Sequence, residues 1–204
     1  AELPPDAVVL EVGSGCGLTA VGLAAARPLA KVIATDCCEE VLQNLRHNVC
    51  TAGVGGAVSV VDWDAARAQA RFPFDLRRVT DVLAADVVYD TGASEGFVHT
   101  LAALLEVRPD VTIRLLLVDR RGVQARWQGW RLVELRQVAF EQDFLECAAN
   151  AGLHCEREHL RASVVHRVRE SQDWETRARW WIAQHWDTLH VYRVSRPAAQ
   201  PSAE

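Results

Sequence analysis

A glycine-rich loop between a buried strand and a helix constrains the fold of this chain more than any other feature. Residues 9–17 read Val-Leu-Glu-Val-Gly-Ser-Gly-Cys-Gly, with apolar residues before them and a small-residue helix expected at 18–26. Gly13, Gly15 and Gly17 stand at alternate positions, which lets backbone amides approach a ligand closely. The loop therefore predicts a nucleotide-like cofactor at the carboxyl end of the first strand.

The spacing of the glycines distinguishes between two cofactors. A dinucleotide fingerprint places its third glycine one position later, where this chain has Leu18, and it has no special use for Glu11 two residues before the first glycine. The spacing favours S-adenosylmethionine over NAD. A glycine turn that only packs strand against helix, and an NAD-dependent oxidoreductase, are the alternatives at this point.

Strand-like runs of Val, Ile and Leu alternate with helical patterns along the chain, which indicates an α/β fold with a mostly parallel sheet. A polar stretch containing Arg and Trp follows the fifth strand, and we predict no element within it. The expected strands are 7–12, 31–36, 58–63, 80–86, 112–119, 155–160 and 188–194, and the expected helices are 18–26, 39–52, 97–107 and 138–151. Seven strands are therefore predicted.

Acidic and aromatic residues follow successive predicted strands. Asp36 ends the second strand, where a carboxylate can accept hydrogen bonds from both hydroxyls of a ribose. Asp62 and Trp63 end the third strand and suit an adenine, and the segment from Asp86 to Tyr89 follows the fourth. Because open α/β sheets bind ligands at the carboxyl ends of their strands, we expect these residues to lie around one site. Core packing is the alternative for Trp63.

Composition limits the classes of protein that this chain can represent. Its 204 residues are 50% hydrophobic and 24% charged, which fits a single globular domain over residues 1–196 with a disordered tail at 197–204. Because the net charge is −5, the electrostatic field of the whole molecule does not favour a nucleic-acid substrate. Neither a secretory leader nor a membrane-spanning apolar run is visible, so we expect an intracellular protein, in the cytoplasm or nucleus. We also expect a monomer without a metal site. The chain lacks methionine, and we expect that a segment before residue 1 is missing.

With these motifs in place, residues 8–152 resemble the protein-lysine branch of the class I, seven-strand methyltransferases, the methyltransferase-like family sixteen. The resemblance rests on four features of the sequence. One of them, an acid followed three residues later by an aromatic residue (Asp86 and Tyr89), is typical of the branch. These features are the loop from Glu11 to Leu18, Asp36, the pair Asp62-Trp63, and the segment Ala85-Asp86-Val87-Val88-Tyr89. The resemblance implies a Rossmann-like seven-strand sheet with helices on both faces.

The resemblance also implies an activity and a set of site residues. The activity is transfer of a methyl group from S-adenosylmethionine to a lysine of a protein substrate. Asp86 and Tyr89 would face the substrate amine. The residues implied at the cofactor are Glu11, Gly13, Gly15, Gly17, Asp36, Asp62, Trp63 and Ala85. A small-molecule or RNA methyltransferase and a non-catalytic cofactor-binding interaction module are the alternatives. The family pattern gives no role to Trp174, Trp180, Trp181 and Trp186, for which core packing is the first interpretation.

Overall fold

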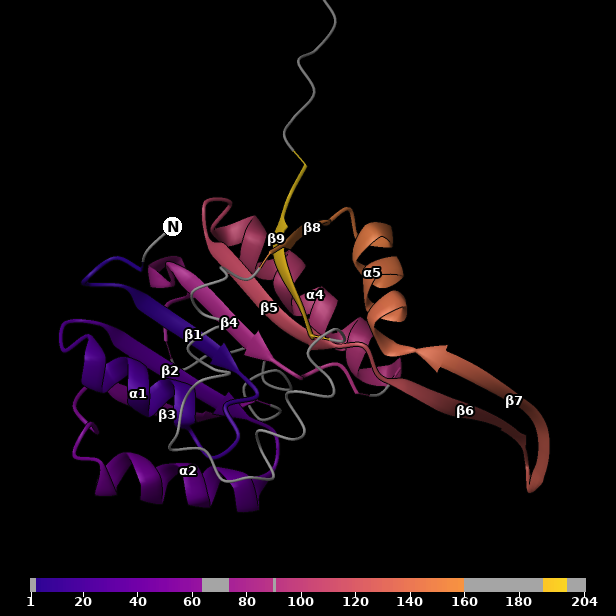
Figure 1. The fold of residues 1–204 in the computed structure, drawn as a ribbon, viewed down its shortest axis with the longest axis horizontal. Coiled ribbons are helices and arrows are strands. Elements are labelled where there is room, and N and C mark those ends of the chain that lie inside the picture. Colours follow the sequence, from indigo (N-terminus) through magenta and orange to yellow (C-terminus); the bar gives the residue numbers. More distant parts are fainter. Residues whose placement is uncertain (1–2, 64–73, 90, 160–188, 198–204) are drawn as a thin grey trace, which may run out of the picture.

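A seven-stranded sheet forms the centre of the protein, with strand order β3-β2-β1-β4-β5-β9-β8 (Figure 1). The computed structural model describes residues 3–63, 74–89, 91–159 and 189–197. The strands of the sheet are Val8–Val12 (β1), Lys31–Asp36 (β2), Val58–Asp62 (β3), Asp81–Ala85 (β4), Thr112–Val118 (β5), His154–Glu158 (β8) and Leu189–Ser195 (β9). The first five run parallel, and β9 is antiparallel to both β5 and β8.

Helices cover both faces of this sheet, and each face has its own hydrophobic cluster. The helices are Leu18–Ala26 (α1), Glu39–Thr51 (α2), Thr91–Val107 (α4) and Phe140–Asn150 (α5), with a short 3₁₀ turn at Leu76–Arg78 (η1). Small residues such as Ala20 and Ala24 bring α1 close to Ala34 of β2, and Leu45 of α2 joins them. The larger cluster lies between β1, β4, β5 and β9 and the helices α4 and α5, where Phe144 is fully buried. The predicted Rossmann-like sheet with helices on both faces is confirmed.

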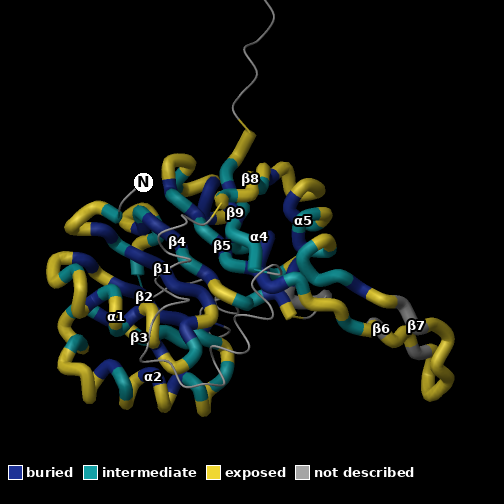
Figure 2. The backbone as a smooth tube through the Cα atoms, in the orientation of Figure 1, coloured by how far each residue is buried: buried dark blue, intermediate teal, exposed yellow. Residues whose placement is uncertain are grey.

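Buried positions follow the strands of the sheet, as Figure 2 shows in dark blue. The polar residue Glu141 of α5 joins this core to the last strand. Its Oε1 accepts a hydrogen bond of 2.7 Å from the hydroxyl of Tyr192 and also contacts Nδ1 of His190. These contacts hold β9 against α5. Among the described residues, no helix combines the length and the hydropathy that a membrane span requires.

A two-stranded hairpin projects from the body between β5 and α5 (Figure 1). Its strands are Arg121–Gln128 (β6) and Arg131–Ala139 (β7), joined by Gly129 and Trp130. The prediction of a stretch without elements was wrong here, because alternating residues on both sides of a two-residue turn form a hairpin. Helix α4 also begins six residues earlier than predicted, at Thr91. The segment that contains Trp174, Trp180, Trp181 and Trp186 lies outside the described residues, as does the tail 198–204.

Candidate functional site

Sterics require glycine at two positions of the loop between β1 and α1. Gly13 has a φ angle of 70° and Gly17 one of 88°, which residues with a Cβ rarely adopt. A Cβ on Gly13 would lie 2.6 Å from Cγ1 of Val87, and a Cβ on Gly17 would overlap Cδ1 of Leu45. The loop is therefore packed against the segment after β4 on one side and against α2 on the other. The contact with Val87 joins the first motif of the sequence to the last.

The carboxylate of Asp36 ties the end of β2 to the same loop. Its Oδ2 accepts a hydrogen bond of 3.0 Å from the backbone N–H of Gly15, and its Oδ1 accepts one of 2.8 Å from the N–H of Cys37. Oδ1 also accepts a bond of 3.2 Å from the N–H of Cys38, whereas Oδ2 accepts only the one from Gly15 among the described residues. Because a carboxylate oxygen has two acceptor sites, Oδ2 can accept a further hydrogen bond from a ligand hydroxyl. A Cβ on Gly15 would meet no atom within 4 Å, so the middle of the loop borders open space. Asp36 and the loop thus lie together, as the sequence predicts.

Glu11 places a buried carboxylate behind the loop. The residue is 6% exposed, and its Oε2 has no hydrogen-bond partner within the described part of the chain. Burial raises the pKa of this carboxyl, and hydrogen-bonding groups of Ser14, Thr19 and Ala20 partly offset the rise. An ionised carboxylate with an unused acceptor in a buried position favours a neighbouring cation. The site therefore suits a ligand that carries positive charge.

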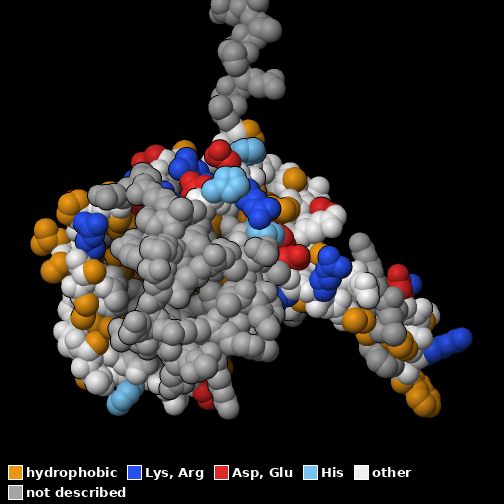
Figure 3. All heavy atoms as spheres, viewed as in Figure 1, with side chains coloured by type: hydrophobic (Ala, Val, Ile, Leu, Met, Phe, Trp, Pro, Cys, Tyr) orange, Lys and Arg blue, Asp and Glu red, His pale blue; other side chains and the backbone are white. Residues whose placement is uncertain are grey.

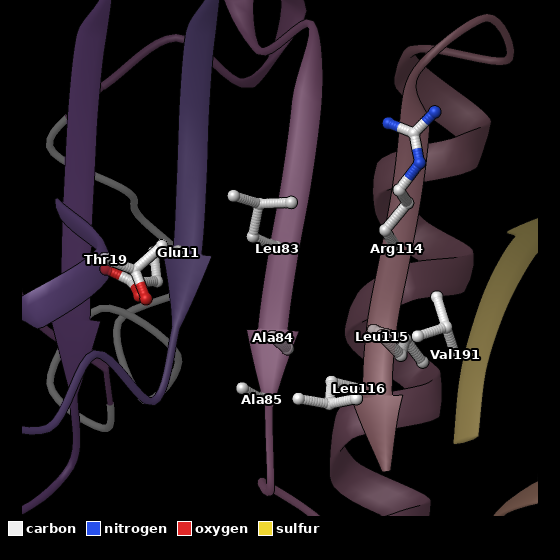
Figure 4. Close-up of a pocket in the computed structure, with 9 residues that line it drawn as sticks. All are labelled: Glu11, Thr19, Leu83, Ala84, Ala85, Arg114, Leu115, Leu116 and Val191. Carbon is white, nitrogen blue, oxygen red and sulfur yellow. The ribbon is translucent and has the colours of Figure 1, made fainter. Parts of the chain in front are cut away.

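A cavity of about 180 Å³ begins at Glu11 and continues across β4 to β5 and β9 (Figure 4). Glu11 and Thr19 form its polar end, and Leu83, Leu116 and Val191 line it farther along. Two residues of the predicted cofactor set, Glu11 and Ala85, therefore line the cavity. The cavity therefore adjoins the loop on the face of the sheet that α1 covers.

The predicted adenine pair is divided between the edge of the sheet and the core. Asp62 ends β3 and is half-buried, opposite Asp36 in the register of the two strands. Trp63 is 6% exposed and belongs to the cluster that contains Ile33 and Val88. Its ring thus contributes to the hydrophobic core at this edge of the sheet. A contact between Trp63 and an adenine stays a prediction.

Asp86 follows β4 in an unusual backbone conformation. Its φ angle is 57°, the only positive value among the described residues other than glycine, and its N–H donates to the carbonyl of Leu116 at 2.8 Å. Asp is one of the residues that adopt this conformation at tolerable cost. Such an outlier at a strand end is typical of functional sites, where packing maintains the strain.

The side chain of Asp86 forms an ion pair that the sequence analysis missed. Its Oδ2 contacts the guanidinium of Arg120, whereas its Oδ1 is buried and has no hydrogen-bond partner within the described residues. Burial raises the pKa of Asp86, and the charge and hydrogen bond of Arg120 oppose this rise. Tyr89, three residues later, is 56% exposed. Arg120 lies 34 positions away in the sequence, so no local spacing could have paired it with Asp86.

Solved structures with similar folds define the fold class of the chain. An S-adenosylmethionine-dependent methyltransferase from Aquifex aeolicus has a TM-score of 0.60 at 16% identity, over 95% of this chain and 84% of that one. A precorrin-6y C5,15-methyltransferase from Geobacter metallireducens GS-15 has a TM-score of 0.57 at 13% identity, over 94% of this chain and 80% of that one. The chain has the class I methyltransferase fold.

The sequence then identifies the family. The model of the lysine methyltransferase family matches residues 5–126, more than half of the chain, and the chain belongs to that family. The protein-lysine N-methyltransferase EFM3 of Chaetomium thermophilum is 29% identical over 124 residues, which cover 58% of this chain. The chain spans 37% of the length of that relative. The family match confirms the resemblance that the motifs predict, to the lysine branch of the methyltransferases.

The described residues fit S-adenosylmethionine as the cofactor. The unused acceptor of Glu11 suits a positively charged group, and the remaining acceptor site on Oδ2 of Asp36 suits a ribose hydroxyl. The N-terminus of α1 has no side-chain cap within the described chain, so its first N–H groups can bind a carboxylate. Ammonium, sulfonium, ribose diol and carboxylate are all present in this one cofactor. The residues thus fit the methionine part and the ribose of this cofactor.

Proposed function

We propose that this chain transfers a methyl group from S-adenosylmethionine to the side-chain amine of a lysine in a protein substrate. The observation that carries the proposal is the buried Oδ1 of Asp86 beside the cofactor loop, which has no hydrogen-bond partner among the described residues. This oxygen can accept a hydrogen bond from an amine at the carboxyl edge of the sheet. The family match and the named activity of the fungal relative support the same chemistry.

In this proposal the loop and the strand ends hold the cofactor. Backbone groups of Gly13, Gly15 and Gly17 approach its methionine part, with Glu11 near the ammonium. Asp36 holds the ribose, Asp62 and Trp63 border the adenine, and Ala85 supplies a backbone contact. When bound, the cofactor supplies an electrophilic sulfonium methyl group. The contact of Val87 with Gly13 then fixes the distance between the loop and Asp86.

Asp86 and Arg120 act differently on the substrate amine: Asp86 orients it, and Arg120 favours its neutral form. A lysine amine must lose its proton before it attacks, and nearby positive charge lowers its pKa. Arg120 supplies such a charge and also opposes the rise in the pKa of Asp86. Oδ1 of the ionised Asp86 accepts a hydrogen bond from the amine, and this bond orients the lone pair of the amine nitrogen toward the methyl carbon. Tyr89, exposed at the same edge, lines the entry of the lysine side chain.

The remaining expectations about partners and location belong to this proposal. Residues 1–196 act as one methyltransferase domain, and a protein with an accessible lysine is the substrate. The domain works as a monomer in the cytoplasm or the nucleus. We expect a nucleic acid to be a poor acceptor, because the chain has a net charge of −5.

The test uses a feature of this sequence, which contains a single lysine, Lys31. The substitution Lys31→Arg removes the only lysine that the enzyme could methylate on itself. Label from methyl-labelled S-adenosylmethionine is then followed into lysine-containing peptides, and mass spectrometry locates it. Asp86→Asn in the same background keeps a residue that tolerates the positive φ angle.

Two outcomes of this test decide the proposal. We expect label on lysine nitrogen and a loss of at least about 100-fold in turnover for Asp86→Asn, with cofactor affinity within about twofold. Asp110→Asn, on the opposite edge of the sheet, is the matched control and should keep full turnover. Label on RNA or on a small molecule alone would contradict the lysine assignment. Cofactor binding without transfer to any acceptor would favour the non-catalytic alternative.

A further inference from the structure

The hairpin of β6 and β7, residues 121–139, makes little contact with the rest of the described chain; we call it the arm. At its root, a Cβ on Gly122 would lie 2.5 Å from the ring of Phe140, and the N–H of Phe140 donates to the carbonyl of Arg120 at 3.1 Å. Beyond this root, the two strands of the arm mainly contact each other among the described elements (Figure 1). Isolated two-stranded hairpins are marginal in water. The arm therefore presents two strands whose surface nothing in the described fold covers.

Exposed apolar side chains are concentrated on the arm. Eight large hydrophobic side chains of the described chain are exposed, and half of them lie on these 19 residues. They are Val123 at 66%, Trp130 at 97%, Leu132 at 40% and Val133 at 39%. Tryptophan at an exposed tip is the residue type that most often contributes strongly to protein interfaces. The apolar part of the arm thus favours a macromolecular partner over plain solvation.

The charge of the arm is opposite to that of the whole chain. It contains four arginines and one glutamate, a net charge of +3, whereas the chain as a whole carries −5. Arg126 pairs with Glu134 at 2.9 Å, and Arg121 and Arg131 are exposed. Figure 3 shows basic and hydrophobic side chains together along the arm. Guanidinium groups bind carboxylates through two parallel hydrogen bonds, so the charge selects an acidic partner.

The root of the arm is also part of the candidate site. Arg120, the residue before β6, forms the ion pair with Asp86. The strand β6 has eight residues and so reaches about 26 Å from this point at about 3.3 Å per residue. A molecule bound along the arm would therefore have one end at Asp86. This geometry connects the arm to the substrate amine.

We propose that the arm is the docking site for an acidic, apolar-containing segment of the protein substrate, within about 26 Å of the target lysine. This inference rests on the proposed function, since it assigns the substrate class for the same site. Trp130 and Leu132 bury apolar side chains of the segment, and Arg121 and Arg131 bind its carboxylates. Substrate specificity thus resides in the arm, and the chemistry resides at Asp86.

The test measures peptide binding separately from methyl transfer. The probe is a fluorescein-labelled peptide of about twenty residues with one lysine and, about seven residues from it, an Asp-Glu-Leu-Asp-Glu-Leu segment. A twin peptide has Asn and Gln in place of the acids. Anisotropy gives the dissociation constant for the wild type and for a Trp130→Ala, Arg131→Glu double variant. The matched control, Leu29→Ala with Arg77→Glu, likewise removes an exposed apolar side chain and reverses an exposed arginine, at residues near the amino ends of the parallel strands.

We expect the acidic peptide to bind the wild type at least about tenfold more tightly than its neutral twin, and the arm variant to remove this preference. The control should keep it, and both variants should bind S-adenosylmethionine normally. Equal affinity of the arm variant and the wild type for the acidic peptide would overturn the inference. Binding of an oligouridine RNA through the arm, without binding of the peptide, would also overturn it. Because this readout needs no turnover, absence of methyl transfer would contradict the proposed function and leave the docking result standing.

Discussion

The cofactor loop and the arm differ in how closely they pack against the rest of the fold. The first and last glycines of the loop are restricted, because a Cβ on Gly13 would meet Val87 and a Cβ on Gly17 would overlap Leu45. The arm packs only at its root, and Trp130 at its tip is 97% exposed. The family match ends at residue 126, within the first strand of the arm. This contrast agrees with the two proposals, which assign the chemistry to the packed part and substrate recognition to the exposed part.

The largest effect should come from filling the packed loop. Gly17→Ala adds a Cβ that overlaps Leu45 in a backbone conformation unfavourable to Ala, and should cost about 3 kcal/mol of unfolding free energy. Gly53→Ala is the matched control, because Gly53 has a φ angle of 69° and open space around its Cβ position. It should cost about 1 kcal/mol. Equal losses in urea unfolding would show that the loop is not held by packing against α2.

Burial of the Glu11 charge should oppose stability and support cofactor binding. Glu11→Gln should weaken binding of S-adenosylmethionine about tenfold, while the thermal midpoint stays the same or rises. The pKa of Glu11 is raised above its ordinary value of 4.5, so protonation favours the folded state and this contribution is lost as pH rises through the raised pKa. The variant should therefore gain stability over the wild type as pH rises. In the same interval the affinity of the wild type for the cationic cofactor should increase, and that of the variant should stay flat. A parallel pH dependence of the two proteins would contradict the role of Glu11.

A smaller effect is expected where the arm meets the site. Arg120→Gln removes the charge that opposes the rise in the pKa of Asp86, so the acidic limb of the kcat/KM profile should move to higher pH. Loss of the same charge raises the pKa of the bound substrate amine, so the acidic limb of the kcat profile should also move to higher pH. Arg121→Gln, one residue into the arm, is the control and should leave the limb in place. An unchanged limb for Arg120→Gln would separate the arm from the chemistry.

The smallest effect concerns stability of the arm itself. Trp130→Ala should change the unfolding free energy by no more than about 0.5 kcal/mol, because its side chain packs against little. Phe144→Ala, in the core next to the root of the arm, should cost about 3–5 kcal/mol. Chemical denaturation of both variants measures the difference. A large loss for Trp130→Ala would mean that the tip is part of the folded core.

Sequence analysis succeeded where local physics determines structure. The glycine loop, the strand that precedes it and Asp36 could be predicted, because tight backbone turns and buried strands leave strong local patterns. Helix α4 begins before its prediction because Gly92 and Gly96 lower helix propensity, and packing overrides that cost.

Features that depend on distant contacts were missed. The arm did leave a signal, since apolar and polar residues alternate on both sides of Gly129 and Trp130. The pair of Arg120 with Asp86 and the burial of Oε2 of Glu11 left none, because both arise only when the strands are assembled.

The central claim is that the glycine loop and the segment of Asp86 form one cofactor-binding site through the contact of Gly13 with Val87. Calorimetric titration with S-adenosylmethionine tests it on the wild type, on Gly13→Ala and on Gly13→Ala combined with Val87→Ala. We expect micromolar binding by the wild type, a loss of at least about 100-fold in Gly13→Ala, and partial recovery when the Val87 side chain is also shortened. Unchanged binding by Gly13→Ala would show that this contact does not shape the cofactor site.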